Sequence, residues 1–568
     1  MMIEQLADNE YEKWIKSNKF DRFWNGDASL WTNNDENRWV GWLKLPILTD
    51  HDFDKIRLIS ADLKKIGCKY IVLLGMGGSS LCPDMMANIF NQQASIYPKL
   101  FVLDSTDPTQ ILALEQKIDL KQSFFIVSSK SGNTLETAFL KTHFYEKLQK
   151  IYGKNNVGNY FLAITDPGST LDIQAKAEHF KATFYGLSSI GGRYSALSHF
   201  GMVPAGLSGV DIKTLLKNAQ KTYEQFKHSN SHHQNPAIQL GILLGVCAGQ
   251  GKNKLTLILS PQIQSLGAWL EQLIAESTGK SSKAIIPIDG EPLGEVESYS
   301  LDRVFVSITI PPSSNEEKAQ HQTIEKKLHQ LEQAGQIIIR LKMPDIMHIS
   351  VEMYRWEIAT AVASSIMGVN PFNQPDVEST KKRTSEIMRL NNKLTQSDSK
   401  IASENIYSSK HLTIYAYTNA TLKSHDLLAI LKAFITLLQP EDYFNISAFI
   451  EMSEQNSEIL QDIRILIRNY IKVATCLGFG PRFLHSTGQA HKGGPNTGLF
   501  LQITTDYPDE HKIPILNTSF ANVISAQAQA DLDVLVNLSR RVMRVHIHGN
   551  VYEGLVELRN IIENIVSK

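Results

Sequence analysis

Four apolar runs between residues 70 and 165 constrain the fold more than any other feature. They read YIVLLG, KLFVL, FFIV and YFLAI, and polar loops and helical patterns separate them. Unbroken apolar strands that alternate with helices are typical of a parallel sheet covered on both faces. The segment therefore predicts an α/β fold in which helices flank a parallel sheet in three layers, α/β/α.

The same alternation continues along the chain. NKLTLILSP, RVFVSITI and QIIIRLKM predict strands of a second α/β unit, and HLTIYAY, YFNISAFIE, GLFLQITTD and RVHIHG predict a third. The polar stretch 395–409 between them indicates a linker. We expect four parts: an N-terminal arm at 1–50, a first unit at 51–215, a second at 216–395 and a C-terminal α/β unit at 410–568. The tryptophan-rich arm is expected to anchor itself by aromatic burial.

Composition excludes several classes of partner. The formal net charge is -1 and the pI is near 7.0, which argues against binding to nucleic acid or to an anionic membrane. No run approaches the ~18 apolar residues that span a bilayer, and the first residues lack the pattern of a signal peptide. Four widely spaced cysteines argue against a zinc site and fit a reducing compartment. We expect a cytoplasmic protein.

The stretch SSKSGNTLET at 128–137 lies where a buried strand ends and a helix begins. Ligands of parallel α/β sheets collect at this edge, and the helix N-terminus offers free N–H groups and a positive dipole end. Alternatively, the hydroxyl groups only cap the helix, although capping needs one of them rather than several. We favour a site for a phosphate ester, with the candidate ligands Ser129, Lys130, Ser131, Asn133 and Thr134.

A second loop of the same kind follows the first strand. GMGGSS contains Gly78 and Ser79 and lacks the GK[ST] of a nucleotide P-loop. Glycine-rich turns between strand and helix are common, so this loop alone is weak support. Two phosphate-friendly loops at equivalent strand ends reinforce each other.

These motifs carry a resemblance to a known family. SSKSGNTLET resembles the phosphate loop of sugar isomerase (SIS) domains, and LLGMGGSSLCP, GGRYSALS, AESTGK and GVNPFNQPDVESTK follow the order expected of the glucose-6-phosphate isomerase family. The whole chain most resembles the isomerase half of fused transaldolase–glucose-6-phosphate isomerases. The resemblance implies two SIS-like domains at 51–215 and 216–395 and a reversible interconversion of glucose 6-phosphate and fructose 6-phosphate, in glycolysis and gluconeogenesis.

The resemblance also implies roles for single residues. It makes Glu276 the base that moves a proton between C2 and C1 of a cis-enediol, with Gln272 one helical turn away as a substrate contact. It places Arg193 beside the enediolate, where a permanent charge is suited to an oxyanion. Gln374 is implied in substrate binding and Lys381 in opening of the sugar ring. Structural alternatives are an exposed helix carboxylate for Glu276 and an ion pair for Arg193.

Two departures from the family pattern lie next to these residues. Asn373 replaces the usual Asp and Asp376 the usual Gly, and Lys382 adjoins Lys381. The spacing Glu378-x-x-Lys381 favours Lys381.

Histidine is placed unusually. The family carries its catalytic His between the Glu and the Gln/Lys motif, where this chain has only unmatched histidines. The segment LHSTGQAHKGG in the third unit resembles the family's His-bearing segment instead. This makes His485 the match for the ring-opening residue, with His491 as a nearby competitor and a purely structural loop histidine as the alternative.

His546 and His548 alternate within RVHIHG, so they should share one face of a strand. A metal pair would need a third ligand, and no residue with convincing spacing accompanies them. We therefore favour strand packing, and we expect neither a metal nor another cofactor.

The sequence leaves two alternatives open: an isomerase for another sugar phosphate such as mannose 6-phosphate, and a catalytically silent SIS-type regulator that binds a phosphosugar. Retention of Glu276 and Arg193 argues against the regulator, because binding phosphate needs neither. In the family the catalytic His comes from the neighbouring subunit, so the resemblance implies a homodimer.

Overall fold

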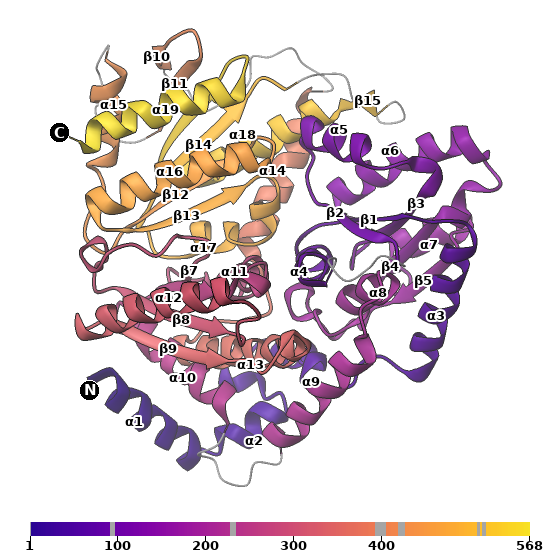
Figure 1. The fold of residues 1–568 in the computed structure, drawn as a ribbon, viewed down its shortest axis with the longest axis horizontal. Helices are drawn as coiled ribbons and strands as arrows, with labels where there is room; N and C mark the ends of the chain where they lie inside the picture. Colours follow the sequence, from indigo (N-terminus) through magenta and orange to yellow (C-terminus); the bar gives the residue numbers. More distant parts are fainter. Residues whose placement is uncertain are drawn as a thin grey trace.

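The computed structural model describes residues 2–90, 97–227, 235–391, 405–417, 426–507, 512–513 and 518–567. Within these residues the chain forms three large sheets with helices packed on them (Figure 1). In Figure 1 the first sheet lies on the right, the second at lower left and the third at upper left. The predicted class, parallel sheets flanked by helices, is confirmed for the first two sheets.

The first sheet has five parallel strands in the order β2-β1-β3-β4-β5. All residues of β3 and β4 are buried, as their unbroken apolar sequence predicts. The strands are β1 (Tyr70–Gly75), β2 (Lys99–Leu103), β3 (Ser123–Ser128), β4 (Phe161–Thr165) and β5 (Ala182–Tyr185). The helices of this unit are α3 (Asp50–Lys65), α4 (Leu81–Phe90), α5 (Pro108–Lys117), α6 (Leu135–Tyr152), α7 (Thr170–Ala177) and α8 (His199–Leu207).

The second sheet is also parallel, in the order β7-β6-β8-β9. Its strands are β6 (Lys254–Leu259), β7 (Ile286–Ile288), β8 (Arg303–Thr309) and β9 (Ile337–Lys342). The helices of this part are α9 (Ile212–Lys227), α10 (Pro236–Gly249), α11 (Leu266–Thr278), α12 (Asn315–Gln333), α13 (Ile349–Met367) and α14 (Pro375–Asn391).

The third sheet is mixed, in the order β10-β11-β17-β14-β12-β13, because β11 pairs antiparallel with both of its neighbours. Its strands are β10 (Asn405–Ser408), β11 (Leu412–Tyr417), β12 (Tyr443–Ala448), β13 (Ala474–Phe479), β14 (Gly498–Thr505) and β17 (Arg541–Ile547), and β15 (Lys512–Ile513) pairs with β16 (Thr518–Ser519) outside it. The helices are α15 (Leu427–Ile435), α16 (Glu454–Ile471), α17 (Gly488–Gly493), α18 (Phe520–Asn537) and α19 (Val551–Val566).

The expected linker differs from the structure at its end. Residues 395–404 lie outside the described residues, whereas Asn405–Ser408 form β10 and pair with β11. The third sheet therefore begins before the expected start at 410. A polar composition did not distinguish this edge strand, because such strands carry polar side chains on their solvent-facing side.

The N-terminal arm is anchored by its aromatic residues, as predicted. It contains α1 (Met2–Lys16) and α2 (Lys19–Trp24), and Trp14, Trp31 and Trp42 are buried in the core that the first two sheets share. The indole N–H of Trp31 donates to the carbonyl oxygen of Ala361 at 2.8 Å. This packing leads the arm toward the same region as the strand ends of the first sheet.

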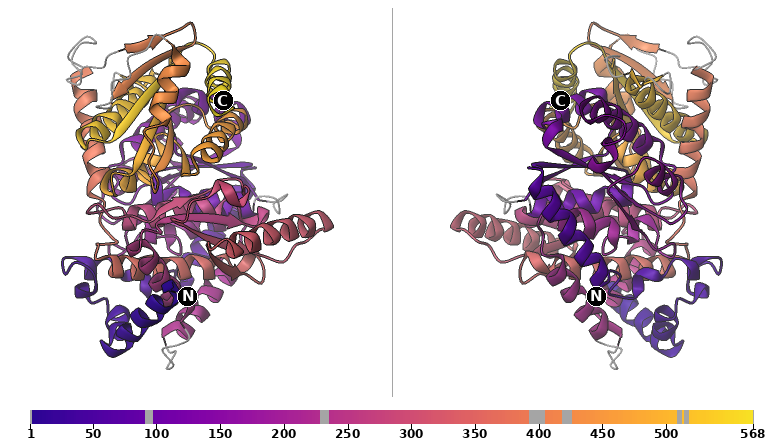
Figure 2. Two further views of the ribbon diagram at one scale, coloured as in Figure 1. Left: turned by 90° about the vertical axis from the view of Figure 1, so that its left-hand side faces the viewer. Right: turned by 90° about the vertical axis from the view of Figure 1, so that its right-hand side faces the viewer.

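The third unit has its own apolar core and contacts both other sheets (Figure 2). Arg482 donates to Asp84 and lies 3.0 Å from Asp104 at the first unit. Arg303 in the second sheet pairs with Glu291 and donates to the carbonyl oxygen of Val473 in the third unit. These contacts hold the third unit against the first two units. None of the helices in the described part of the chain combines the length and apolar character needed to span a bilayer.

Candidate active site

A cleft of about 590 Å³ opens where the carboxyl ends of the first sheet meet α11, α14 and the third unit. Its lining residues come from every part of the chain, from Asp35 in the arm to His485. The predicted site residues on its walls are Gly78, Ser79, Lys130, Ser131, Thr134, Arg193, Gln272, Glu276, Gln374, Lys381 and His485. The structure therefore brings together residues that the sequence separates by hundreds of positions.

The loop between β3 and α6 presents an uncapped helix N-terminus to this cleft. Thr134 is the N-cap residue, yet its side chain makes no capping hydrogen bond. Its hydroxyl instead lies 3.0 Å from the hydroxyl of Ser129. The Thr134 hydroxyl therefore does not cap the helix, and the first-turn N–H groups other than that of Glu136, from which the Glu136 carboxylate accepts, are available to an anion.

Two predicted ligands do not reach the cleft wall that the described residues form. Ser129 is buried beneath the loop, where it supports Thr134. Asn133 lines an adjoining cavity of about 240 Å³, which shares Ser131, Lys381 and His485 with the main cleft. Sequence alone did not separate them, because all the polar residues of a short loop look equivalent.

Lys130 is paired rather than free. Its ammonium group donates to Asp166 and lies 5.8 Å from the ring centroid of Trp39. Asp166 thus partly neutralises the positive charge of Lys130. An anion at this loop would therefore depend more on the hydroxyl and backbone N–H donors for its binding.

Close packing of two backbone segments explains why glycine occupies position 78, in the turn after β1. A Cβ atom at Gly78 would lie 2.0 Å from the carbonyl oxygen of Gly192, which is closer than atoms approach. The turn after β1 and the loop that carries Arg193 therefore touch backbone to backbone. A side chain at Gly78 would push Arg193 away from the cleft.

Arg193 and Glu276 form a buried ion pair at the base of the cleft. The guanidinium Nη1 lies 3.3 Å from Glu276 Oε2, and both side chains are almost fully buried. Arg193 also donates from Nη1 to Gln374 Oε1 at 3.1 Å and from Nη2 to the carbonyl oxygen of Pro371 at 2.7 Å. The Arg193 head group is thus fixed in one orientation beside the carboxylate.

Gln272 and Glu276 share one face of α11, as their spacing predicted. Gln272 Nε2 donates to Glu276 Oε2 at 3.1 Å and to the carbonyl oxygen of His485 at 2.9 Å. The same amide thereby ties the second and third units together next to Glu276. Lys280 stabilises the end of α11 by donating to the carbonyl oxygens of Glu276, Ser277 and Asn370.

His485 is oriented by a buried carboxylate. Its Nε2 lies 2.8 Å from Glu136 Oε1, and Gln527 Nε2 donates to the same oxygen at 2.7 Å. Burial alone would raise the pKa of Glu136, but the charge that His485 carries when protonated, together with its hydrogen bond, outweighs burial and lowers that pKa to about 2. Glu136 therefore stays ionised and holds the imidazole ring in place.

His491 lies in a different environment. It is buried, its Nδ1 is 3.0 Å from the Tyr443 hydroxyl, and it does not line the cleft formed by the described residues. Burial, with the nearby charges of Lys492 and Arg540, lowers its pKa to about 3. Of the two histidines in the segment, His485 is the one that the fold directs into the cleft.

The two departures on α14 also have structural explanations. Arg193 contacts residue 373 through the carbonyl oxygen, at 2.8 Å, so Asn serves there as well as Asp. Asp376 Oδ2 accepts from Gln489 Nε2 at 2.6 Å and so helps to dock the segment that bears His485. Lys381 lines the cleft and Lys382 does not, among the described residues, in agreement with the favoured register.

Several cleft residues have no signal in the sequence. Asp35 and Trp39 come from the arm, and Asp166 follows β4. Glu136 lies within the predicted loop motif, but its partner His485 is 349 positions away. Only the last letters of SSKSGNTLET, an acidic residue at the start of a helix facing the cleft, hinted at Glu136.

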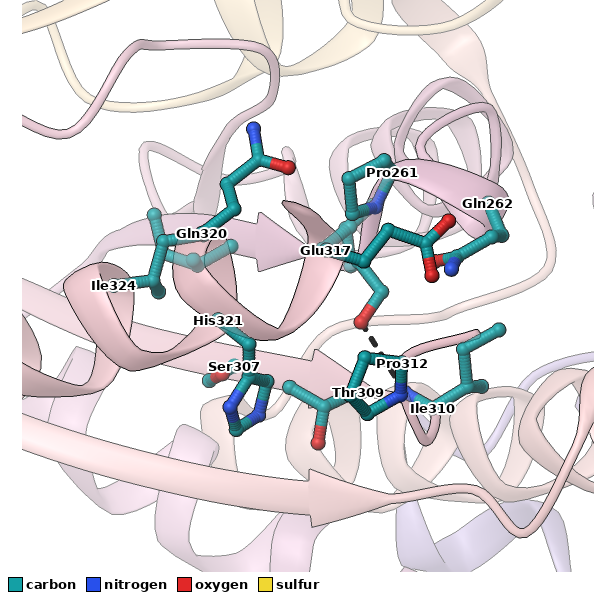
Figure 3. Close-up of a pocket in the computed structure, with 13 residues that line it drawn as sticks. Pro261, Gln262, Ser307, Thr309, Ile310, Pro312, Glu317, Gln320, His321 and Ile324 are labelled. Atoms are coloured by element: carbon teal, nitrogen blue, oxygen red, sulfur yellow. Dashed lines mark hydrogen bonds between the residues drawn. The ribbon is translucent and has the colours of Figure 1, made fainter. Parts of the chain in front are cut away.

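The equivalent edge of the second sheet is nearly closed (Figure 3). A pocket of about 20 Å³ lies beyond β6 and β8, which is room for about one water molecule. The first turn of α12 is capped there, because Ser314 Oγ accepts from the N–H of Glu317 at 3.1 Å. Glu317 itself accepts from the N–H of Ser313 at 2.6 Å and places a carboxylate where an anion would bind.

Comparisons with known proteins find similar sequences. Residues 60–289 match the model of the family described as phosphoglucose isomerase. A protein named glucose-6-phosphate isomerase from Lactococcus lactis subsp. cremoris (strain MG1363) is 28% identical over 387 residues, which cover 61% of this chain and 86% of that protein. One of the same name from Clostridioides difficile (strain 630) is 28% identical over 389 residues, with the same two coverages.

A solved structure supports the fold. The crystal structure of a glucose-6-phosphate isomerase from Chlamydia trachomatis D/UW-3/Cx superposes with a TM-score of 0.56 at 19% identity, and covers 69% of this chain and 86% of that one.

Proposed function

We propose that this chain, whose residues 60–289 match the model of the phosphoglucose isomerase family, belongs to that family and interconverts glucose 6-phosphate and fructose 6-phosphate. The single observation that carries the proposal is the cleft in which Glu276, Arg193 and His485 face an uncapped helix N-terminus. A base, a fixed cation and an anion site are the groups that aldose–ketose isomerisation of a phosphosugar requires. The proposed enzyme class is an aldose–ketose isomerase that uses no cofactor.

The phosphate group is proposed to bind at the loop between β3 and α6. Ser131 and Thr134 line the cleft there, and the first turn of α6 adds N–H donors. Gly78 and Ser79 form the opposite wall. Binding at this position directs the sugar toward Arg193 and Glu276.

Glu276 is proposed to be the base of the isomerisation. Its carboxylate takes the proton from C2 of the open-chain aldose and returns it to C1, through a cis-enediol. Arg193, 3.3 Å from that carboxylate, balances the negative charge that develops on the enediolate oxygens. Gln272 donates to Glu276 and keeps the carboxylate at the cleft wall.

His485 is proposed to open the ring of the cyclic sugar before isomerisation. A neutral imidazole takes the proton of the ring's C1 hydroxyl and delivers it to the ring oxygen. Glu136 holds this imidazole at 2.8 Å, and Lys381 lines the cleft beside it. All these groups belong to one chain.

A coupled assay on the purified full chain tests the proposal. Fructose 6-phosphate is supplied, and glucose 6-phosphate is detected through a dehydrogenase that reduces a nicotinamide cofactor. We expect turnover that is lost in Glu276→Gln. Binding without turnover would support the regulator, and turnover of mannose 6-phosphate alone would support a different isomerase.

Three further features remain proposals. The homodimer rests on the family resemblance alone, because His485 reaches the cleft within its own chain; size-exclusion chromatography with light scattering tests it. A cytoplasmic location fits the four free cysteines. The likeness to the isomerase half of fused transaldolase–glucose-6-phosphate isomerases also stays a prediction.

A further inference from the structure

Three side chains at one end of the third sheet converge outside the cleft. Asp506 follows β14, His546 lies in β17, and His548 comes directly after β17. One ligand atom from each lies within 4.8 Å of the others. None of them lines the cleft of the proposed active site.

Both imidazole rings face the same carboxylate. Nε2 of His546 lies 3.0 Å from Asp506 Oδ1, and Nδ1 of His548 lies 3.1 Å from Asp506 Oδ2. Atoms bound tetrahedrally at about 2.05 Å from one metal ion lie about 3.4 Å apart. A small rotation of the mostly exposed Asp506 side chain therefore separates the three ligand atoms enough to admit an ion.

In each ring, the nitrogen that does not face Asp506 lies within hydrogen-bond distance of a threonine hydroxyl. Thr504 Oγ1 lies 2.9 Å from Nδ1 of His546, and Thr413 Oγ1 lies 2.9 Å from Nε2 of His548. When these hydroxyls accept the ring N–H groups, the nitrogens that face Asp506 carry lone pairs. Metal-binding histidines are typically held in this way, by a hydrogen bond from the nitrogen that does not bind the metal.

The site is open to solvent. The side chain of Asp506 is 60% exposed, that of His548 38% and that of His546 23%. Exposure of this kind leaves the three side chains accessible to an ion from solvent. It also leaves room for water molecules to complete the coordination of an ion.

We propose that Asp506, His546 and His548 bind a divalent transition-metal ion such as Zn²⁺, Ni²⁺ or Co²⁺. Two imidazoles favour these ions over Mg²⁺ and Ca²⁺, which prefer oxygen ligands. No third ligand could be predicted from the sequence, because Asp506 lies 40 positions from His546, directly after a different strand. The parallel pairing of β14 with β17 supplies it, and a bound ion connects the ends of these two strands.

Isothermal titration of the full chain, stripped with a chelator and then supplied with Zn²⁺ or Ni²⁺ alone, tests the proposal. We expect one ion per chain. His546→Ala and Asp506→Asn should weaken binding by more than the 10- to 100-fold that outer partners contribute, whereas Thr504→Val should weaken it about 10- to 100-fold. His329→Ala removes a more exposed imidazole on α12, 65% accessible, and should leave binding unchanged.

Two further measurements keep the test independent of isomerase activity. The absorption spectrum of bound Co²⁺ should report nitrogen ligands in the unaltered chain and lose this signature in the His546→Ala, His548→Ala double variant. Zn²⁺ should raise the melting temperature of the unaltered chain but not of the double variant, whose circular dichroism checks its folding. Absence of binding at millimolar Zn²⁺ or Ni²⁺, or binding unaffected by the double substitution, overturns the proposal.

Discussion

The carboxyl edges of the first and second sheets have the same order of strand, loop and helix, but only the first opens into a large cleft. In both, a buried parallel strand ends in a loop and a helix follows: β3 leads to α6 and β8 leads to α12. The first edge opens into a cleft of about 590 Å³, whereas the second encloses about 20 Å³ (Figure 3). Architecture alone therefore does not make a ligand site.

Capping decides the difference. At α12, Ser314 caps the first turn and Glu317 accepts hydrogen bonds from Ser313, so the protein itself satisfies the helix N-terminus. At α6, Thr134 makes no capping bond and lines the cleft, while Leu135 and Glu136 of the first turn line the adjoining cavity. A helix whose own side chains leave its first turn uncapped has donors available for a phosphate ester.

The largest expected effect concerns the carboxylates near the two edges. Glu276→Gln keeps the shape of the side chain but loses the proton acceptor, so kcat should fall by at least about 100-fold. Glu317→Gln at the closed edge should leave kcat unchanged. Both variants are assayed with fructose 6-phosphate, and solvent deuterium incorporation at C2 of glucose 6-phosphate is followed. Exchange at the unaltered rate in Glu276→Gln would exclude Glu276 as the base.

The histidines provide the next contrast. His485→Ala should slow turnover of cyclic sugar phosphates by about tenfold or more, and should affect an open-chain aldose phosphate far less, because that substrate needs no ring opening. His321→Ala, which alters the closed pocket of Figure 3, should change neither rate. His491→Ala should be mild for turnover. Equal losses on both substrates in His485→Ala would assign His485 to folding or to enolisation.

An added negative charge should have different effects at the two loops. Ser131→Asp places a carboxylate beside the proposed phosphate, and repulsion at close range should raise KM for fructose 6-phosphate by about tenfold or more. Ser314→Asp puts the same charge at a position where Asp is a good N-cap, so KM and stability should hardly change. An unchanged KM in Ser131→Asp would remove the loop from the site.

The smallest effects should appear when one hydroxyl is removed at each edge. Ser314→Ala loses a cap and should lower the free energy of unfolding by about 1 kcal/mol without changing KM. Thr134→Ala loses no cap, so stability should hold while KM rises a few-fold. Chemical denaturation and steady-state kinetics on both variants measure the two effects. The reverse pattern would contradict the role assigned to capping.

The sequence predicted features whose residues are adjacent in the chain, and it missed those that only the folded loops and the tertiary packing create. The apolar runs predicted β1 to β4, and short motifs predicted Glu276, Gln272 and Arg193, because each signal lies within one strand, loop or helix. The burial of Ser129 and the position of Asn133 depend on how one loop folds, which its letters do not record.

Contacts between residues that lie far apart in the sequence could not be predicted, for a different reason. Glu136 and His485 are brought together only by the packing of the third unit on the first, and Trp39 reaches the cleft only because the arm folds back. Asp506 meets His546 through the register of two parallel strands. In each case the tertiary arrangement, not local preference, creates the contact.

The spread of the cleft along the chain has a consequence for synthesis. About 450 residues separate Asp35 from His485, and both line the same cavity. At the usual elongation rates a ribosome needs roughly 20 to 90 s to add that length. Late in that interval the proposed phosphate loop and Glu276 have been made, whereas His485, the proposed ring-opening residue, has not. A nascent or truncated chain that ends before His485 would thus carry the proposed phosphate loop without the complete set of proposed catalytic residues, and full activity would require synthesis through His485.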